Sequence, residues 1–287
     1  MLTQVVFPKA GVAGWPVWHS RSPMIHGYWL NTLGIAGAYD RFEVRPGEFD
    51  KFARLIGCDG LVGVNVTAPH KASAFAACDR HTAVAGALKA VNTLWRKDGL
   101  LWGDNTDVEG FLANMDVTAP GWSSSSDSAI VIGAGGAARA IVYALASRGF
   151  RRIAIVNRTQ AKAVALAGEF SDVAVAAPWE TLSAELPRGN LLVNASSLGM
   201  IGQPPLEIEV NALRRGSVVS DIVYVPLRTS MVKSARALGL QAVEGLGMLL
   251  HQAVPAFERW FGRRPEVTPA LRSLIEADIL AADEERR

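Results

Sequence analysis

The sequence is poor in the residues that build disulfide frameworks and metal sites. Its 287 residues include two cysteines, Cys58 and Cys78, which do not form a CxxC pair. The five histidines show neither HExxH spacing nor cysteine partners, so we predict no metal site. This low cysteine content excludes a disulfide scaffold and is typical of a protein from a reducing compartment.

The sequence also lacks a long uninterrupted apolar segment and a strong net charge. Its longest apolar stretch, residues 129–146, is broken by three glycines and an arginine, which argues against a membrane span. The N-terminus has no basic segment before an apolar run, so we predict no signal peptide and a cytoplasmic location. The net charge is +2 with scattered cations, which argues against a nucleic-acid partner.

The length and the residue pattern predict an α/β protein of two lobes. A chain of 287 residues, 49% of them hydrophobic, suits two globular domains. We expect a smaller α/β substrate domain over 1–106 and a Rossmann domain over 107–245. Residues 246–287 are expected to form helices that return to the first lobe. Two lobes predict a cleft that binds a small molecule.

Apolar runs alternate with helical patterns in both lobes. After Ser128 the rhythm predicts a doubly wound parallel sheet. The strands expected there are 129–132, 152–157, 173–177, 191–194 and 218–223, with helices through Leu145, from Gln160 and over 231–238. In the first lobe we expect strands at 11–17, 38–44, 60–67, 90–96 and 99–104, with helices starting near Ser22, Glu48 and Pro69.

A glycine motif follows the first strand of the second lobe. Gly133, Gly135 and Ala138 occupy the positions of G-x-G-x-x-G/A, between a predicted strand and a predicted helix. In this context the glycines allow a tight turn and a close approach of the backbone to a pyrophosphate at the helix N-terminus. The motif therefore predicts dinucleotide binding; a packing turn or another nucleotide-like ligand is the alternative.

The next strand ends in residues that favour NADP over NAD. An NAD-binding domain usually carries an acidic residue here, whereas this chain has Asn157, Arg158 and Thr159. Arg158 can pair with a 2′-phosphate, and Lys162 could add a second cation. The alternative is that both cations belong to an ordinary solvated face.

Residues 19–23, HSRSP, combine a helix start with two hydroxyl groups. We expect Ser22 to be the N-cap and Pro23 to open the helix. Ser20 would then have its hydroxyl beside exposed backbone N–H groups, a place that can hold a carboxylate or a phosphate.

Two further stretches, 65–71 and 103–107, are hard to explain by folding alone. We expect Pro69 to open a helix and Lys71 to lie in its first turn, where a cation is unfavourable and gives up its proton more readily. Thr106 and Glu109 have capping-box spacing, which places Asp107 at another helix start. An ionised Asp107 near Lys71 would orient it, although each residue alone has an ordinary structural explanation.

Eight motifs occur in the order found in shikimate dehydrogenases. They are HSRSPMIH, NVTAPHK, AVNT, GDNTD, GAGGAAR, NRT, NASSLGM and EGLGMLLHQA. The chain resembles this family over nearly its whole length. The resemblance implies a reversible, NADPH-dependent reduction of 3-dehydroshikimate to shikimate. The sequence leaves open whether the protein is a monomer or a homodimer.

The resemblance also assigns roles to residues. It implies that Lys71 and Asp107 form the catalytic pair and that Ser20, Ser22 and the nearby Tyr224 hold the substrate carboxylate. Thr67, Asn92, Asp107 and Gln252 would hydrogen-bond the substrate hydroxyls. The residues expected to contact the cofactor are Gly133, Ala134, Gly135, Gly136, Ala137, Asn157, Arg158, Thr159, Lys162, Gly245 and Met248.

Several positions depart from the family pattern and keep other substrates open. They are Gly27, Lys89, Val108 and Pro255. Quinate or an aminated analogue could replace shikimate, and a redox sensor that binds NADP(H) without turnover is a further alternative. The presence of both Lys71 and Asp107 argues against the sensor.

Overall fold

The computed structural model describes residues 7–125 and 127–284, and these form two compact units. The first unit contains the described residues up to Thr106 and residues 252–275. The second contains 107–251 and the described residues from Glu276 onward. The division into domains at 1–106, 107–245 and 246–287 stays a prediction; by these contacts the two C-terminal helices are shared between the units.

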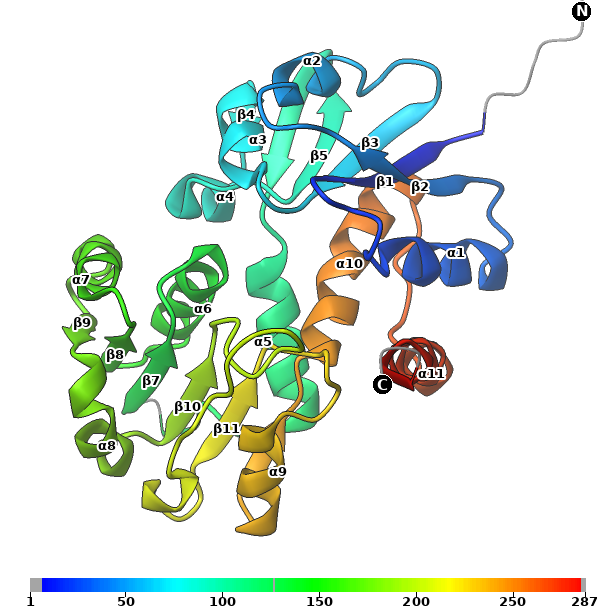
Figure 1. Ribbon diagram of the computed structural model, residues 1–287. Coiled ribbons are helices and arrows are strands. Elements are labelled where there is room, and N and C mark those ends of the chain that lie inside the picture. The colour runs from blue at the N-terminus through cyan, green and yellow to red at the C-terminus, as the bar shows by residue number, and fades with distance from the viewer. Residues whose placement is uncertain (1–6, 126, 285–287) are drawn as a thin grey trace, which may run out of the picture. The chain divides into compact units, whose positions relative to one another are not determined.

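The first unit is built on a mixed six-stranded sheet. Its strands are β1 (Lys9–Gly14), β2 (Ala38–Glu43), β3 (Leu61–Val66), β4 (Arg80–His81), β5 (Thr93–Lys97) and β6 (Leu100–Asp104). They run in the order β2-β1-β3-β5-β6-β4 (Figure 1). β1 pairs in parallel with β2 and β3, whereas β5 is antiparallel to β3 and β6. The short β4 is parallel to β6.

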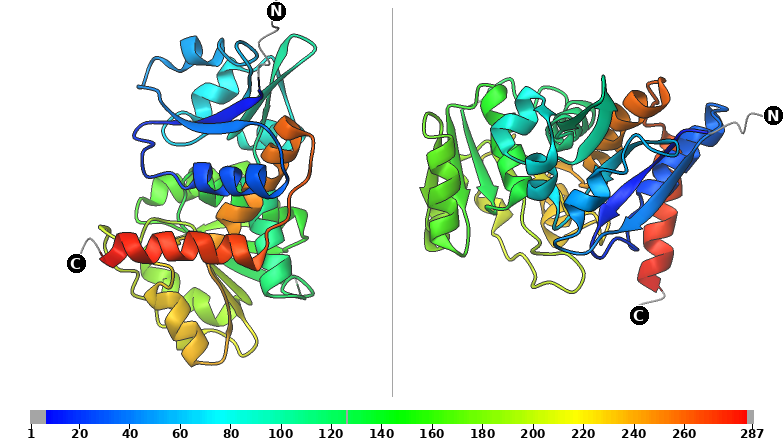
Figure 2. Two further views of the ribbon diagram at one scale, coloured as in Figure 1. Left: turned by 90° about the vertical axis from the view of Figure 1, so that its right-hand side faces the viewer. Right: turned by 90° about the horizontal axis from the view of Figure 1, so that it is seen from above.

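Helices of the first unit pack against this sheet. They are α1 (Ser22–Thr32), α2 (Phe49–Ala53), α3 (Lys71–Ala77) and α4 (Ala83–Leu88). Figure 2 shows α1 beside β1 and β2, drawn in blue. The long helices α10 (Leu246–Phe261) and α11 (Pro269–Glu284) each cross from one unit to the other.

The second unit is a doubly wound parallel sheet, as predicted. Its strands are β7 (Ser128–Ile132), β8 (Arg152–Val156), β9 (Ala174–Ala177), β10 (Leu191–Asn194), β11 (Val218–Asp221) and β12 (Gln241–Val243). The order β12-β11-β10-β7-β8-β9, all parallel, is that of the Rossmann fold. Side chains of β7, β8 and β10 are buried throughout their central residues, as expected for a sheet covered on both faces.

The connecting helices of this unit follow the strands in sequence. They are α5 (Asp107–Thr118), α6 (Gly136–Ser147), α7 (Gln160–Glu169), α8 (Leu182–Glu185) and α9 (Ser230–Ala237), with short 3₁₀ helices η1 (Trp179–Thr181), η2 (Leu186–Arg188) and η3 (Val210–Ala212). In the described part of the chain, no helix has the length and apolar character needed to cross a membrane.

An aromatic cluster in the first unit encloses His26. The imidazole is fully buried and stacks on the Tyr39 ring, with centroids 4.0 Å apart and planes inclined by 8°. The rings of Trp29, Phe257 and Trp260 lie within 6 Å of it. Neither ring nitrogen has a hydrogen-bond partner among the described residues. Burial therefore lowers the pKa of His26 to about 3.

This burial predicts an acid-labile fold. The unfolded chain takes up a proton at His26 below pH 6.5, whereas the folded chain does not until about pH 3. Stability is therefore lost as pH falls through that window. Between pH 7.5 and 5.0, His26 should contribute about 2 kcal/mol to the loss of unfolding free energy. Urea unfolding at both pH values measures the free energy of unfolding. Between the two pH values, His26→Phe should lose about 2 kcal/mol less of it than the parent protein. An equal change of the unfolding free energy with pH in the two proteins would contradict the prediction.

Candidate active site

The start of α1 places Ser20 and Ser22 differently from the prediction. Ser22 is not the N-cap: it is the first helical residue, after Arg21, whose side chain makes no capping hydrogen bond. Instead the Ser20 hydroxyl accepts a hydrogen bond from the Ser22 N–H at 3.3 Å. The capping oxygen thus comes from Ser20, one residue before the N-cap residue Arg21. Arg41 donates to the Ser20 carbonyl and fixes the approach to this turn.

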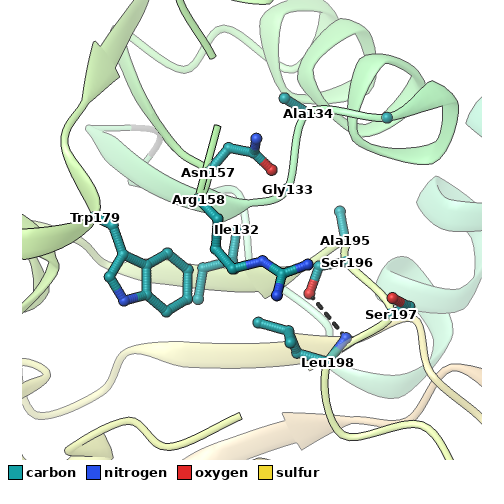
Figure 3. A pocket seen from close by; sticks show the side chains of 11 residues that line it. Ile132, Gly133, Ala134, Asn157, Arg158, Trp179, Ala195, Ser196, Ser197 and Leu198 are labelled. Atoms are coloured by element: carbon teal, nitrogen blue, oxygen red, sulfur yellow. Dashed lines mark hydrogen bonds between the residues drawn. The ribbon is translucent and has the colours of Figure 1, made fainter. Parts of the chain in front are cut away.

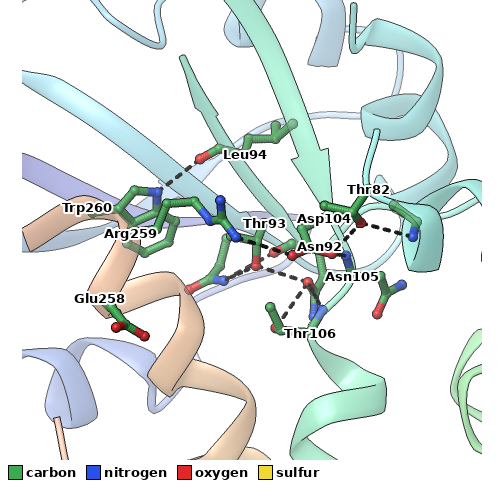
Figure 4. A network of polar contacts seen from close by, with 12 residues as sticks. Thr82, Asn92, Thr93, Leu94, Asp104, Asn105, Thr106, Glu258, Arg259 and Trp260 are labelled. Carbon is green, nitrogen blue, oxygen red and sulfur yellow. Dashed lines mark hydrogen bonds and ion pairs between the residues drawn. The ribbon is translucent and has the colours of Figure 1, made fainter. Parts of the chain in front are cut away.

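A buried network of neutral polar groups surrounds Asn92, between β3 and β5. The Asn92 Oδ1 atom accepts hydrogen bonds from the Thr106 N–H at 2.9 Å, the Thr106 hydroxyl at 3.2 Å and the Thr93 hydroxyl at 3.0 Å. Figure 4 shows these side chains together with Asp104 and Asn105. The Thr106 hydroxyl also lies 3.5 Å from Gln252 Oε1. The structure therefore brings the predicted residues Asn92 and Gln252 to one network.

Thr67 and Lys71 lie on segments tied to the same strand. Val66, which precedes Thr67, donates its N–H to the Asn92 carbonyl at 2.8 Å. Val91 donates its N–H to the Lys71 carbonyl at 3.0 Å. The helix α3 begins at Lys71 and not at Pro69, because residues 67–70 form a turn closed by a hydrogen bond from His70 to Thr67. Lys71 is in the first turn, as predicted, and is half-buried.

Asp107 is the first residue of α5 and is 8% exposed. A carboxylate is favourable at this end of a helix, as the sequence predicted. Lys71 belongs to the first unit and Asp107 opens the second, so their pairing stays a prediction. The same holds for Tyr224, which follows β11 in the second unit and is half-exposed.

A pocket of about 240 Å³ opens at the carboxyl ends of the strands in the second unit. Its lining comes from the turns after β7, β8, β9 and β10 (Figure 3): Ile132, Gly133, Ala134, Gly135, Asn157, Arg158, Trp179, Ala195, Ser196, Ser197 and Leu198. This is the edge at which open α/β sheets bind ligands. Five predicted cofactor residues, Gly133, Ala134, Gly135, Asn157 and Arg158, thus line one pocket.

The glycine turn is closed against the loop that follows β10. Gly133 has φ +114°, and a Cβ atom there would lie 2.8 Å from the Ala195 carbonyl oxygen. Both the backbone angle and the space therefore require glycine at this position. Gly136 and Ala137 begin α6 directly after the pocket, which points backbone N–H groups of the first helical turn toward this edge.

The segment after β8 carries the cations expected at a 2′-phosphate. Asn157 donates from Nδ2 to the Thr159 carbonyl at 2.9 Å and so shapes the turn into α7. Arg158 is exposed, and its guanidinium points toward the loop after β10 (Figure 3). Lys162 is exposed on α7 but does not line the pocket.

Gly245 and Met248 mark the start of α10 rather than the pocket wall. A Cβ atom on Gly245 would lie 2.8 Å from the Asp221 carbonyl oxygen, so this glycine allows close packing on the end of β11. Its carbonyl accepts the Met248 N–H at 3.1 Å. Neither residue lines the pocket, and their contact with a cofactor stays a prediction.

Sequence reasoning missed the network that holds one wall of the pocket. Asn194 Oδ1 accepts from the N–H and the hydroxyl of Ser196, and Nδ2 donates to the Leu198 carbonyl and to Asp221 Oδ1. Asp221 also accepts from the Thr229 hydroxyl at 2.6 Å and the Val223 N–H at 3.0 Å. Burial raises the pKa of Asp221, and these donors oppose that effect. The sequence offered one weak signal, a carboxylate at the end of an apolar strand.

Trp179 was missed as well. It follows β9, starts η1 and lines the pocket next to Arg158 (Figure 3). The sequence carried no signal for it beyond a tryptophan after a short strand.

Among the described residues, no group of three His, Cys, Asp or Glu side chains could hold a metal ion.

The strand order and the glycine turn define a dinucleotide-binding α/β protein, and comparisons with known proteins place it more narrowly. The protein-family model described as "Shikimate dehydrogenase substrate binding domain" matches residues 12–94. "Shikimate / quinate 5-dehydrogenase" matches 115–212, and "Shikimate 5'-dehydrogenase C-terminal domain" matches 245–275.

Individual relatives agree with these matches. The chain is 55% identical to "Shikimate dehydrogenase (NADP(+))" of Methylocella silvestris, over 95% of this chain and 97% of that protein. Quinate dehydrogenase from Corynebacterium glutamicum, solved with NAD, has a TM-score of 0.87 at 29% identity, covering 94% and 99% of the two chains. Shikimate 5-dehydrogenase from Thermus thermophilus, solved with NADP(H) and shikimate, has a TM-score of 0.81 at 32% identity, covering 95% and 99%. This chain belongs to the shikimate dehydrogenase family.

The residues of the pocket fit the dinucleotide that this family implies. The position of Gly133 has no room for a side chain, so the backbone itself forms the floor of the turn. A helix begins directly after it, and a cation and an aromatic ring lie on one side of the pocket. Such a turn suits a pyrophosphate, while arginine suits a phosphate and tryptophan a base.

Gly133→Ala should therefore weaken NADPH binding. A side chain would need both a strained φ and a shift of the Ala195 carbonyl, so we expect a loss of affinity of about 10-fold or more. Titration with NADPH followed by nicotinamide fluorescence measures it. Gly168→Ala is the control, since Gly168 is exposed on α7 and its Cβ would meet no atom within 4 Å. Unchanged affinity in Gly133→Ala would show that the turn does not approach the cofactor.

Proposed function

We propose that this chain catalyses the reversible, NADPH-dependent reduction of 3-dehydroshikimate to shikimate. The observation that carries the proposal is the 55% identity, over nearly the whole of both chains, to a protein named shikimate dehydrogenase (NADP(+)). The pocket with Gly133 and Arg158 in one unit and the polar network around Asn92 in the other support it.

In the proposed reaction, Lys71 and Asp107 handle the proton. The bound cofactor supplies a hydride to the ring ketone, and the oxygen of that ketone must gain a proton. The Lys71 ammonium gives this proton from Nζ and, in the reverse direction, takes it back. Asp107 orients the ammonium toward that oxygen.

We infer that neutral groups of the first unit orient the substrate. Ser20 and Ser22 hold the carboxylate together with Tyr224, since hydroxyl groups near a helix start suit an anion. Thr67, Asn92, Asp107 and Gln252 hydrogen-bond the ring hydroxyls. The position of Asn92 and Gln252 in one network supports this assignment.

We infer further that Arg158 selects NADP. Its guanidinium can form two parallel hydrogen bonds with a 2′-phosphate, which the ribose hydroxyl of NAD does not offer. Asn157 and Thr159 shape the turn that presents it, and Lys162 adds a longer-range attraction. Trp179, beside Arg158, supplies a flat apolar surface for the adenine.

The assay that tests the function follows nicotinamide absorbance with purified protein, shikimate or quinate, and NADP or NAD. We expect turnover of shikimate with NADP. Lys71→Ala should lower kcat about 1000-fold because it removes the proton donor, with the KM for NADP unchanged. Lys51→Ala, at an exposed position of α2, should keep the parent rate.

Other outcomes of this assay have defined meanings. Preference for quinate with NAD would replace the proposed substrate and cofactor. Tight NADPH binding without turnover of either acid would indicate a sensor. Full activity of Lys71→Ala would overturn the assignment of the proton donor even if shikimate is the substrate.

Cofactor preference gives a separate prediction. Arg158→Gln should raise the KM for NADP about 10-fold to 100-fold while the KM for NAD changes little, since only NADP loses a charged pair. The ratio of kcat/KM for the two cofactors measures this effect. Lys233→Ala is exposed on α9 of the same unit and should leave the ratio unchanged. An equal loss for both cofactors would mean that Arg158 does not contact the 2′-phosphate.

A further inference from the structure

His70 is a buried histidine that directly precedes Lys71 and is 2% exposed. Its Nε2 atom lies 2.6 Å from the Val44 carbonyl oxygen. A carbonyl can only accept, so Nε2 carries a hydrogen and donates it. The imidazole also stacks on the Phe49 ring, with centroids 5.2 Å apart and planes inclined by 26°. The side chain therefore ties the residue before the lysine to a segment 26 residues earlier in the chain.

The segment that accepts this hydrogen bond is itself firmly held. Val44 follows β2 and donates its N–H to the Gly14 carbonyl at 3.1 Å, which extends the pairing of β1 with β2 by one residue. Val44 and Phe49 are 4% and 2% exposed and lie in one apolar cluster with Ala74 of α3. The carbonyl of Val44 thus has a fixed position relative to the sheet.

The start of α3 lacks the serine, threonine, aspartate or asparagine cap that usually fixes a helix end. His70 is the N-cap residue, and within the described part of the chain its side chain makes no hydrogen bond that caps the helix. Ala74 donates its N–H to the His70 carbonyl at 2.8 Å, which begins the helix. The side chain of the N-cap residue thus holds the helix start against β2 and not against the helix itself.

This contact affects the lysine because His70 and Lys71 share one peptide unit. Consecutive Cα atoms are about 3.8 Å apart, so a shift of His70 moves the backbone of Lys71 with it. The lysine side chain carries that shift to Nζ. A proton donor must lie within hydrogen-bond reach of the reacting oxygen, and a misplacement of about 1 Å can lower a rate about 100-fold.

We propose that His70 is a positioning residue, whose hydrogen bond to Val44 holds the backbone of Lys71 so that its ammonium meets the reacting oxygen of the substrate. The inference rests on the proposed function, in which Lys71 gives the proton. A phenylalanine or a leucine would fill the same space without burying a polar ring, so burial alone does not explain an imidazole here. The imidazole adds a donor that is aimed at one carbonyl.

Two substitutions separate the hydrogen bond from the packing. His70→Phe keeps a ring against Phe49 but removes the donor, whereas the amide introduced by His70→Gln can donate in place of the imidazole. We expect His70→Phe to lower the rate of a single turnover of shikimate with NADP about 10-fold to 100-fold, with the KM for NADP unchanged. His70→Gln should recover most of that rate. Nicotinamide absorbance after rapid mixing measures this step separately from product release.

His81 supplies a matched control on the same helix. Its Nε2 atom donates to the Phe75 carbonyl at 2.7 Å, and its ring stacks on the Phe75 ring with centroids 4.1 Å apart. Phe75 lies in the C-terminal half of α3, away from Lys71. His81→Phe removes the same kind of hydrogen bond, so it should lower the melting temperature but leave the single-turnover rate unchanged. A loss of rate as large as that of His70→Phe would overturn the inference, since it would reflect general loosening of α3.

A double-mutant cycle tests whether His70 acts through Lys71. In a Lys71→Ala background the proton donor is gone, so adding His70→Phe should change the remaining single-turnover rate by less than about twofold. A loss of the same size in both backgrounds would mean that the two residues act independently, and the inference would then be wrong.

His70→Asn keeps the inference testable if His70→Phe does not fold. Its amide is one methylene shorter than that of His70→Gln and falls short of the Val44 carbonyl, which the imidazole reaches with its outer nitrogen. We expect a single-turnover rate about 10-fold below that of His70→Gln. Equal rates in the two amide variants would contradict the inference.

These measurements separate the inference from the proposed function. If the parent protein turns over shikimate and Lys71→Ala impairs it, while His70→Phe keeps the parent rate, the inference is wrong and the function stands. Full activity of Lys71→Ala would overturn the assignment of the proton donor and the inference with it, but not shikimate as the substrate. No turnover of shikimate by the parent protein would overturn the proposed function and the inference together.

Discussion

The first unit depends on the requirement that buried donors meet acceptors at the centre of its sheet. Leaving one buried polar group without a partner costs about 1–3 kcal/mol, which is a large fraction of a domain's stability. Around Asn65 and Asn92 these requirements interlock, because the Thr93 hydroxyl accepts a hydrogen bond from Asn65 Nδ2 and donates one to Asn92 Oδ1. These hydrogen bonds therefore depend on one another and do not form independently. Together they hold the side chains in place before any ligand binds.

The second unit meets the same requirement around a carboxylate. Asp221 is 1% exposed and accepts from Asn194, Thr229 and the Val223 backbone. Through Asn194 this set also fixes Ser196 and Leu198, whose loop closes against Gly133. The width of the cofactor pocket is thus decided by backbone atoms on both sides. Changes in the lining side chains can alter which base or phosphate is bound without altering this framework.

Much of the fold could be predicted because buried parallel strands have a plain sequence pattern. The runs around Ile130, Ile153 and Val219 are continuous apolar segments with turns at their ends, and each is a strand of the second sheet. The short strands β4 and β12 were missed, since two or three residues give no periodicity. The helix starts were off by up to two residues. In α1 the capping oxygen comes from Ser20 rather than Ser22, and before α3 residues 67–70 form a turn that delays the helix to Lys71.

The residues of the site could be predicted only where their positions depend on neighbouring residues in the sequence. The glycine turn at Gly133 and the cation at Arg158 are set by their own strand and helix, and both line the pocket. The role of Tyr39 could not be predicted, since its partner Asn65 is 26 residues away and the contact exists only after β2, β1 and β3 assemble. The same reason applies to Asn194 and Asp221, which meet across neighbouring strands.

The neutrality of the Asn92 network has a consequence for proton transfer. The nearby carboxylate, Asp104, accepts from the Thr82 hydroxyl and the Asn105 N–H and forms an ion pair with Arg259 at 3.5 Å (Figure 4). Its charge is thereby balanced away from Asn92, whose own partners are hydroxyls and amides. Charges interact strongly in a site with little water, so an unbalanced carboxylate beside Asn92 would act strongly on these neutral groups and on any ligand next to them. In the proposed reaction, this neutral network would orient the polyhydroxylated ring through hydrogen bonds alone and would leave the transfer of the proton to Lys71 and Asp107.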